Sequence, residues 1–118
     1  MTNHINDHYK DSAELLRIIS HPVRLAILEI LSEKEEICVC HLEAILGYRQ
    51  AYLSQYLMCL RENELVSDRH SGRYVYYRIK EKGVESIIRE TRKCTQTNSI
   101  NFQAQECNCP ECESENSV

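Results

Sequence analysis

Apolar residues recur every three or four positions through most of the first 94 residues, which is the spacing of one face of an α-helix. Local signals mark several helix ends. Asp11 and Glu14 have the spacing of an N-terminal capping box, whereas Pro22 suits a first helical turn and Gly47 a left-handed C-terminal cap. The pattern predicts helices over residues 11–20, 22–32, 38–47, 49–63 and 80–94.

Between Val66 and Ile79 the period changes to two, which indicates strands. One face would carry Val75, Tyr77 and Ile79 and the other Tyr74, Tyr76 and Arg78. The segment from His70 to Arg73 is predicted to form the turn of a β-hairpin. From Thr95 to Val118 the periodicity is lost and the composition is polar. The predicted organisation is therefore a folded domain over residues 1–94 and a flexible, acidic, cysteine-containing tail over residues 95–118.

Two helices joined by a tight turn and followed by a hairpin are typical of a winged helix-turn-helix, so the predicted fold is mainly α with a β-hairpin (α+β). In such a fold the helix over residues 49–63 enters the major groove, where polar side chains near its N-terminal end reach base edges. The wing lies along the DNA backbone or the minor groove. The candidate DNA-binding residues are Arg49, Gln50, Tyr52, Ser54, Gln55 and Tyr56 on the helix, and His70 and Arg73 on the wing.

The net charge of −4 is compatible with DNA binding once the charges are located along the chain. The tail carries carboxylates and no Lys or Arg, so residues 1–94 are formally neutral. Residues 49–78 have a local excess of two positive charges, which suits a dimer that touches few phosphates.

The seven cysteines favour metal or redox chemistry over a disulfide framework. No run of about 18 apolar residues and no N-terminal apolar stretch is present, so a cytoplasmic protein without a membrane span is expected, and its thiols should stay reduced. A thiol enzyme is disfavoured, because no nucleophile with a partner base is evident.

Several stretches, in the right order, resemble the ArsR/SmtB family of metal-responsive winged-helix repressors, over roughly Glu14 to Ile88. They are HPVRLAIL at 21–28, ICVCHL at 37–42, RQAYLSQYL at 49–57, LRE at 60–62 and GRYVYYR at 72–78. The resemblance implies a homodimer, joined through its first and last helices, that binds an inverted-repeat operator in double-stranded DNA and leaves it when an inducer binds. Independently, two recognition helices about 34 Å apart would match successive major grooves.

Cys38 and Cys40 lie where the helix before the recognition helix is predicted to begin. The helix dipole and the unpaired amides of a helix N-terminus favour thiolate, the form that binds metals. Residues two apart in a regular helix point to nearly opposite sides, so the pair could share one ion only if the helix start is distorted. Such a distortion could weaken operator binding by moving the recognition helix. The alternative is that both are small buried residues.

The resemblance leaves the inducer open, because the arsenic-sensing pattern carries a further Cys where this chain has Glu43. The third thiolate must then come from elsewhere. Cys59 occupies the place of a recognition-helix ligand in cadmium- and lead-sensing members, although core packing explains it equally well. Ligands of the zinc-sensing type on the last helix are disfavoured by Lys80 and Gly83, which stand where such ligands would begin.

The tail contains Cys107, Cys109 and Cys112, three thiols close enough to wrap one soft ion or to donate to the Cys38 and Cys40 site. Trigonal all-sulfur coordination suits As(III) or Sb(III) and also Cd(II) or Pb(II), whereas Zn(II) would need a fourth ligand such as Cys94. The tail cluster could also bind metal without any role in switching.

These patterns together predict a DNA-binding transcriptional repressor that releases its operator when As(III) or Sb(III) binds cysteine thiolates. A repressor that responds to Cd(II) or Pb(II) is one alternative. A repressor that senses thiol oxidation or persulfides is another, with Cys40 and Cys94 as one conceivable disulfide pair.

Overall fold

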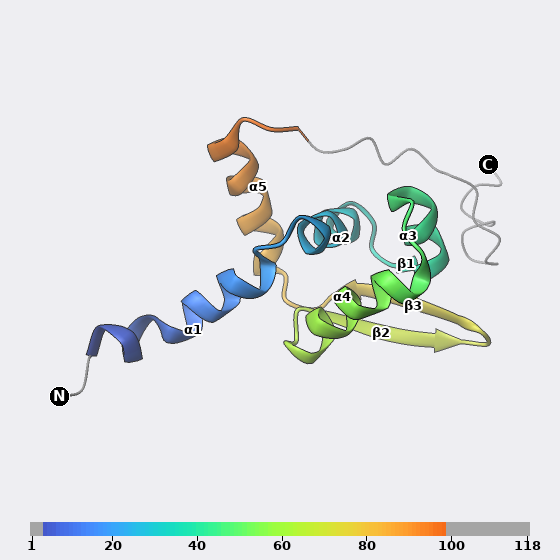
Figure 1. The fold of residues 1–118 in the computed structure, drawn as a ribbon, viewed down its shortest axis with the longest axis horizontal. Helices are drawn as coiled ribbons and strands as arrows, with labels where there is room; N and C mark the ends of the chain where they lie inside the picture. The colour runs from blue at the N-terminus through green and yellow to red at the C-terminus, as the bar shows by residue number, and fades with distance from the viewer. Residues whose placement is uncertain (1–3, 99–118) are drawn as a thin grey trace.

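The computed structural model describes residues 4–98 of the chain. Its elements, in chain order, are α1 (His4–Ile19), α2 (Pro22–Glu33), β1 (Ile37–Cys38), α3 (Val39–Leu46), α4 (Gln50–Glu62), β2 (Val66–Ser71), β3 (Tyr74–Ile79) and α5 (Gly83–Thr95). The strands form one antiparallel sheet in the order β1-β3-β2, and the β2–β3 hairpin projects from the helices as a wing (Figure 1). The predicted winged helix-turn-helix is therefore confirmed.

The core is built around α2, which packs against α4, α5 and β3. Ile27, Leu28 and Ile30 of α2 are fully buried. Leu53, Leu57 and Leu60 of α4 meet them at the spacing of four and three that places all three on one helical face. This buried stripe fixes which face of α4 is left for solvent or DNA.

The turn between α3 and α4 is set by Gly47. Gly47 adopts a left-handed conformation (φ 75°) and its amide donates to the Glu43 carbonyl at 2.8 Å, which ends α3. A side chain at that φ would be strained, so glycine suits the position. Three residues later α4 has begun, and the two helices form the predicted helix-turn-helix.

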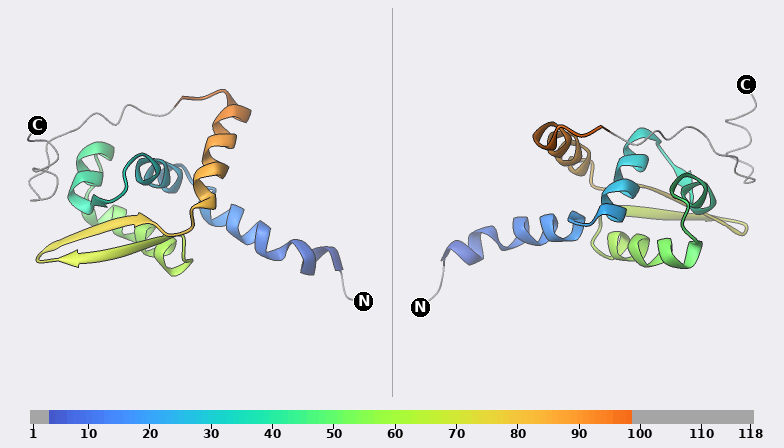
Figure 2. Two further views of the ribbon diagram at one scale, coloured as in Figure 1. Left: turned by 180° about the vertical axis from the view of Figure 1, so that it is seen from behind. Right: turned by 45° about the horizontal axis from the view of Figure 1, so that its top comes forward.

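Helix α1 extends away from the rest of the molecule as an arm (Figures 1 and 2). Only Ile18 and Ile19, at its C-terminal end, are buried. Ile5, Tyr9 and Leu16 are 69%, 60% and 53% exposed, although all three are large apolar side chains. No helix in residues 4–98 is long and apolar enough to cross a membrane.

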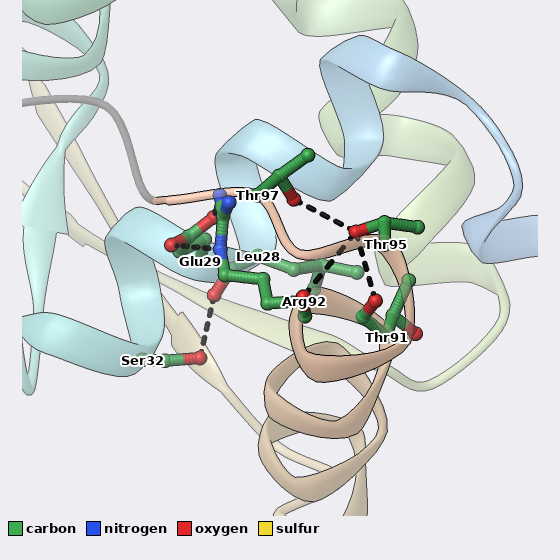
Figure 3. Close-up of polar contacts among 7 residues, drawn as sticks. All are labelled: Leu28, Glu29, Ser32, Thr91, Arg92, Thr95 and Thr97. Atoms are coloured by element: carbon green, nitrogen blue, oxygen red, sulfur yellow. Dashed lines mark hydrogen bonds and ion pairs between the residues drawn. The ribbon is translucent and has the colours of Figure 1, made fainter.

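An ion pair between α2 and α5 lies at the edge of the core. Arg92 of α5 donates from Nε to Glu29 Oε1 at 2.6 Å, and its Nη2 reaches the second carboxylate oxygen. Figure 3 shows the guanidinium extending from α5 to Glu29 on α2, beside the capping contacts of Thr95. Glu29 is only 6% exposed, so this bidentate pair ties the two helices together where little water competes.

The helix start predicted at Asp11 is wrong, because the chain is already helical at His4. No proline or glycine lies between His4 and Asp11, so nothing stops the helix from extending upstream of a residue that merely could cap it. At the other end of the domain, α5 begins at Gly83 instead of Lys80. The amides of Lys80 and Glu81 both donate to the Leu65 carbonyl, which holds these residues in the turn that leaves the sheet.

The hairpin turn is shorter than the predicted segment from His70 to Arg73. His70 and Ser71 belong to β2 and pair with Val75 and Tyr74, which leaves Gly72 and Arg73 as the two-residue turn. The strand β1 was not predicted, because two residues carry no periodicity of their own. It forms by pairing Ile37 and Cys38 with β3.

Candidate functional site

The thiols of Cys38 and Cys40 lie together at the start of α3. Cys38 has an extended backbone (φ −79°, ψ 155°) and caps the helix, with its Sγ accepting a hydrogen bond from the His41 amide at 3.3 Å. Because Cys38 stands outside the helix, helical spacing does not separate it from Cys40, and the two Sγ atoms are 2.6 Å apart. The premise that helical spacing separates the two thiols is therefore wrong, and their sharing of one ion stays a prediction.

The surroundings of this thiol pair come from the wing. Cys38 is fully buried and Cys40 half-buried, and Tyr74 and Tyr76 of β3 pack against them. Cys38 and Tyr76 are also direct partners in the β1–β3 ladder. Among the described residues no cluster of three His, Cys, Asp or Glu side chains could hold a metal. The pair therefore offers two ligands, and a metal ion would need a third from elsewhere.

The other predicted thiol ligands are not brought to the pair. Cys59 is half-buried on α4, where the Asn63 amide nitrogen lies 3.8 Å from its Sγ, and it packs against the core. Cys94 is exposed near the end of α5, and Figures 1 and 2 show α2 between that helix and α3. Cys40 and Cys94 of one chain are thus carried by separate parts of the fold. Three predicted ligands, Cys107, Cys109 and Cys112, lie outside the described residues.

Helix α4 presents most of the predicted DNA-binding residues at its N-terminal half. Arg49 occupies the N-cap position without a side-chain capping bond. Gln50, Tyr52 and Gln55 are exposed, and Ser54 is half-buried. Hydrogen-bonding side chains near the N-terminus of this helix are available to a partner, as reading of base edges requires. Their contacts with DNA stay a prediction.

Tyr56 differs from these residues because it points toward α2. Its hydroxyl lies 3.4 Å from Nε2 of His21 and donates to the Tyr52 hydroxyl at 3.1 Å. Nδ1 of His21 accepts the Val23 amide at 3.1 Å and so caps α2, which leaves the proton of a neutral ring on Nε2. The hydrogen bond from Tyr56 raises the pKa of Tyr52. Tyr56 thus links the recognition helix to the start of α2.

A row of three tyrosines, Tyr48, Tyr52 and Tyr56, begins before α4 and continues along it. Tyr48 was not among the predicted site residues. Tyr48, which is 42% exposed, has its ring centroid 4.8 Å from that of Tyr52, and the Tyr52 and Tyr56 centroids are 5.2 Å apart. The spacing of four residues places Tyr52 and Tyr56 on one face of α4, whereas Tyr48 meets Tyr52 from the turn before the helix. The row makes Tyr48 a further candidate for the DNA-facing surface.

The wing carries the two other predicted DNA-binding residues. His70 is exposed and lies 3.3 Å from the Asp68 carboxylate, which also accepts from Arg61 of α4 at 2.9 Å. Burial acts to raise the pKa of Asp68, but the hydrogen bonds from Arg61 and His70 outweigh it and leave that pKa below its ordinary value. Arg73, at the exposed turn, extends over the ring of Tyr74.

Arg69 and Glu36 were not among the predicted site residues. Arg69 of β2 donates from Nε and Nη2 to the two Glu36 oxygens at 3.2 and 2.6 Å. The hydrogen bond from Arg69 lowers the pKa of Glu36. The guanidinium carbon of Arg69 also lies 4.5 Å from the centre of the Tyr76 ring. No sequence signal joins residues 33 positions apart, so only the register of the sheet reveals this contact.

Comparison with known proteins places the chain among bacterial regulators. Residues 21–68 match the family model described as bacterial regulatory protein, arsR family. The arsenical resistance operon repressor of Escherichia coli (strain K12) is 37% identical over 86 residues, which cover 70% of this chain and 74% of that protein. The repressor of the same name from Staphylococcus aureus is 34% identical over 101 residues, 86% of this chain and 90% of that protein.

The fold agrees with solved structures of such regulators. HlyU from Vibrio cholerae N16961 matches with a TM-score of 0.68 and 28% sequence identity, over 76% of this chain and 97% of that one. Three findings agree on the family: the winged-helix architecture, the accessible recognition helix and the similarity along most of the chain. The chain belongs to the ArsR family of bacterial regulatory proteins, and it is a DNA-binding transcriptional repressor, not an enzyme.

Proposed function

We propose that this chain acts as a homodimeric repressor that leaves its operator when a thiophilic metalloid, As(III) or Sb(III), binds Cys38 and Cys40. The observation that carries the proposal is the 2.6 Å approach of the two Sγ atoms on the element that leads into the recognition helix. Two relatives named arsenical resistance operon repressors support arsenic as the first inducer to test. Cd(II), Pb(II) and Zn(II) are the metal alternatives.

Binding would change the geometry of the α3 start. With a metal–sulfur distance of about 2.3 Å, two sulfurs on one ion lie roughly 3.5–3.8 Å apart, which is close to the ordinary contact distance of two thiols, so the change comes from fitting the ion itself beside them. Cys38 is buried and caps α3, and α3 packs on α4. An ion taken up beside this buried sulfur therefore acts on the helix that positions α4. A coupling of about 1–3 kcal/mol, typical of allosteric proteins, would weaken operator binding roughly 5- to 150-fold.

A third sulfur ligand is still required for a trigonal site. We assign it first to the tail thiols Cys107, Cys109 and Cys112, which are close together in sequence. Cys59 and Cys94 are weaker candidates, since they lie on other helices.

A second candidate function is thiol redox sensing. The observation that favours it is the same contact, because two sulfurs that already touch can lose two electrons and two protons to an oxidant or persulfide and form a disulfide. The inducer experiment separates the two functions.

That experiment is fluorescence anisotropy of the reduced, full-length protein on its own promoter DNA. As(III), Sb(III), Cd(II), Zn(II) and a persulfide donor are titrated separately at one fixed salt concentration, since phosphate contacts make affinity strongly salt-dependent. We expect As(III) or Sb(III) to release the protein at near-stoichiometric amounts. Release by the persulfide donor alone would move the assignment to redox sensing.

Recognition by α4 is tested by replacing Gln50 with Ala. Gln50 is the first residue of α4 and is exposed, and a Gln side chain pairs with adenine through two hydrogen bonds. Losing one such contact should cost about 1–3 kcal/mol, or roughly 5- to 150-fold in operator affinity, with little effect on nonspecific DNA. Anisotropy with operator and scrambled duplexes measures both. Met58→Ala, two turns farther along α4, is the control, and an equal loss on both duplexes would argue against base recognition by Gln50.

The proposed homodimer is tested by changing the exposed apolar face of α1. Ile5, Tyr9 and Leu16 are exposed and follow at spacings of four and seven, which places them along one face of the arm. A second copy of the chain would cover this face. Leu16→Glu would bury a charge there, so we expect the dimer dissociation constant to rise at least about tenfold, because each 1.4 kcal/mol is a factor of ten.

Light scattering coupled to size-exclusion chromatography measures the mass of the Leu16→Glu protein over a range of concentrations. Met58→Glu makes the same kind of change at an exposed apolar residue of α4, away from α1. It should leave the dimer intact. A Leu16→Glu protein that remains fully dimeric at the lowest concentration would contradict α1 as the contact.

A further inference from the structure

One side of the thiol pair is formed by β3, a strand of the wing. In a winged helix the wing is the part that lies along DNA. Tyr76 of β3 is 3% exposed and packs against Cys38, and Tyr74, two residues earlier, packs beside it. Cys38 is itself part of the sheet, because it pairs with Tyr76 through β1. An ion that binds the buried Cys38 sulfur must find room beside Tyr76, so it presses on β3 as well as on α3.

Arg69 connects this side of the thiol pair back to the segment that carries Cys38. Its guanidinium lies over the Tyr76 ring at 4.5 Å and makes two hydrogen bonds to Glu36, two residues before Cys38. Arg69 and Tyr76 are also direct partners across β2 and β3. With the chain between Glu36 and Cys38, these contacts close a ring of four residues, Glu36, Cys38, Tyr76 and Arg69, which we call the wing clamp.

We propose that the wing clamp transmits occupation of the thiol pair to the DNA-contacting wing, with Arg69 as its positioning residue. This inference rests on the proposed function of Cys38 and Cys40 as the inducer site. An ion held by the buried Cys38 sulfur displaces Tyr76, which is 3% exposed and packs against that residue. Because Arg69 joins Tyr76 to Glu36, the displacement turns β2 and β3 together. His70, next to Arg69 in β2, and Arg73 at the turn then leave their positions on DNA.

The clamp suits a test by mutation because its loss should not unfold the protein. The side chains of Arg69 and Glu36 are 44% and 26% exposed, and ion pairs of that kind contribute little to stability. Tyr76 would stay packed against Cys38 when Arg69 is replaced. A change in the response to inducer can therefore be separated from a change in folding.

The first experiment compares operator affinity without and with saturating sodium arsenite in Arg69→Gln. The ratio of the two dissociation constants should fall at least fivefold relative to the wild type. Arg89→Gln removes the same charge from an exposed position on α5 and should keep the wild-type ratio. Arg69→Lys, which keeps a cation beside Glu36 and Tyr76, should recover much of the response.

Two outcomes of that experiment overturn the clamp. If Arg69→Gln weakens binding equally with and without arsenite, Arg69 is only a phosphate contact. If both affinities, and therefore their ratio, equal those of the wild type, the wing is not coupled through Arg69, while the proposed function stands. A wild-type protein that never responds to arsenite would instead sink the proposed function, and the clamp with it.

The second experiment uses the three glycines of the chain as probes in ¹⁵N-glycine NMR spectra. Gly47 reports on the end of α3, Gly72 on the wing turn and Gly83 on the start of α5. Arsenite should shift the Gly47 and Gly72 amides of the wild type, whereas in Arg69→Gln the Gly47 shift persists and the Gly72 shift is lost. A Gly72 shift that survives in Arg69→Gln would refute transmission by the clamp.

Discussion

Replacing Cys38 with Ser is expected to leave the protein on its operator and to abolish release by As(III). Serine removes the thiolate but is among the best N-cap residues, and its oxygen can accept the His41 amide that Sγ accepts now. Stability should therefore stay within about 1 kcal/mol of the wild type, since a cap contributes about that much. Operator affinity without inducer should change little, while the wild-type loss on adding As(III) should disappear.

Anisotropy of Cys38→Ser and Cys40→Ser, each with and without As(III), measures this effect, and thermal melts check the fold. Cys59→Ser is a matched control on the recognition helix, since Cys59 lies apart from the pair. Because we assign the third ligand to the tail, Cys59→Ser should respond to As(III) like the wild type, and a lost response would instead make Cys59 the third ligand. A Cys38→Ser protein that still releases DNA fully would move the sensing site to the tail thiols.

Replacing Arg92 with Ala is expected to produce the largest loss of stability. Removing the guanidinium leaves the Glu29 carboxylate, whose side chain is 8% exposed, without its bidentate partner. Breaking a buried ion pair from one side costs about 3–5 kcal/mol, and the 29% exposure of Arg92 places the expected loss at the lower end of that range. The α2–α5 contact, and with it the position of α5, would loosen.

Urea denaturation at one fixed protein concentration measures this loss, because the stability of an oligomer depends on concentration. Arg89→Ala, exposed on the same helix, should cost no more than about 0.5 kcal/mol. The double variant Glu29→Met and Arg92→Met should recover most of the loss, because an apolar pair of similar size leaves no buried charge. If Arg92→Ala proves as stable as Arg89→Ala, the pair contributes nothing measurable.

The sequence by itself determined the helices of the domain and the character of the fold. Spacing of three and four placed Leu53, Leu57 and Leu60 on one face of α4, and the structure buries all three. Gly47 marked the end of α3, where it adopts the left-handed conformation. These features are local, because a helix joins residues at most a few positions apart, so a short stretch of sequence contains the whole signal.

The sequence also singled out Cys38 and Cys40, but only the tertiary structure decided whether they could meet. Helical spacing argued against a shared ion. The β1–β3 ladder draws Cys38 into an extended conformation before α3 begins, and the two sulfurs then touch. A two-residue strand exists only through its partner, so no pattern within residues 37–40 could reveal it.

The residues that surround the thiol pair were likewise decided by pairing between strands that are far apart in the sequence. Alternation along β3 placed Tyr76 on the face opposite Val75, Tyr77 and Ile79, and Tyr76 is buried there because it packs against Cys38, its neighbour on β1. Arg69 meets Glu36 across 33 positions for the same reason. Periodicity tells which side chains share a face, whereas the register of a sheet determines what lies against that face, and register is set by the fold as a whole.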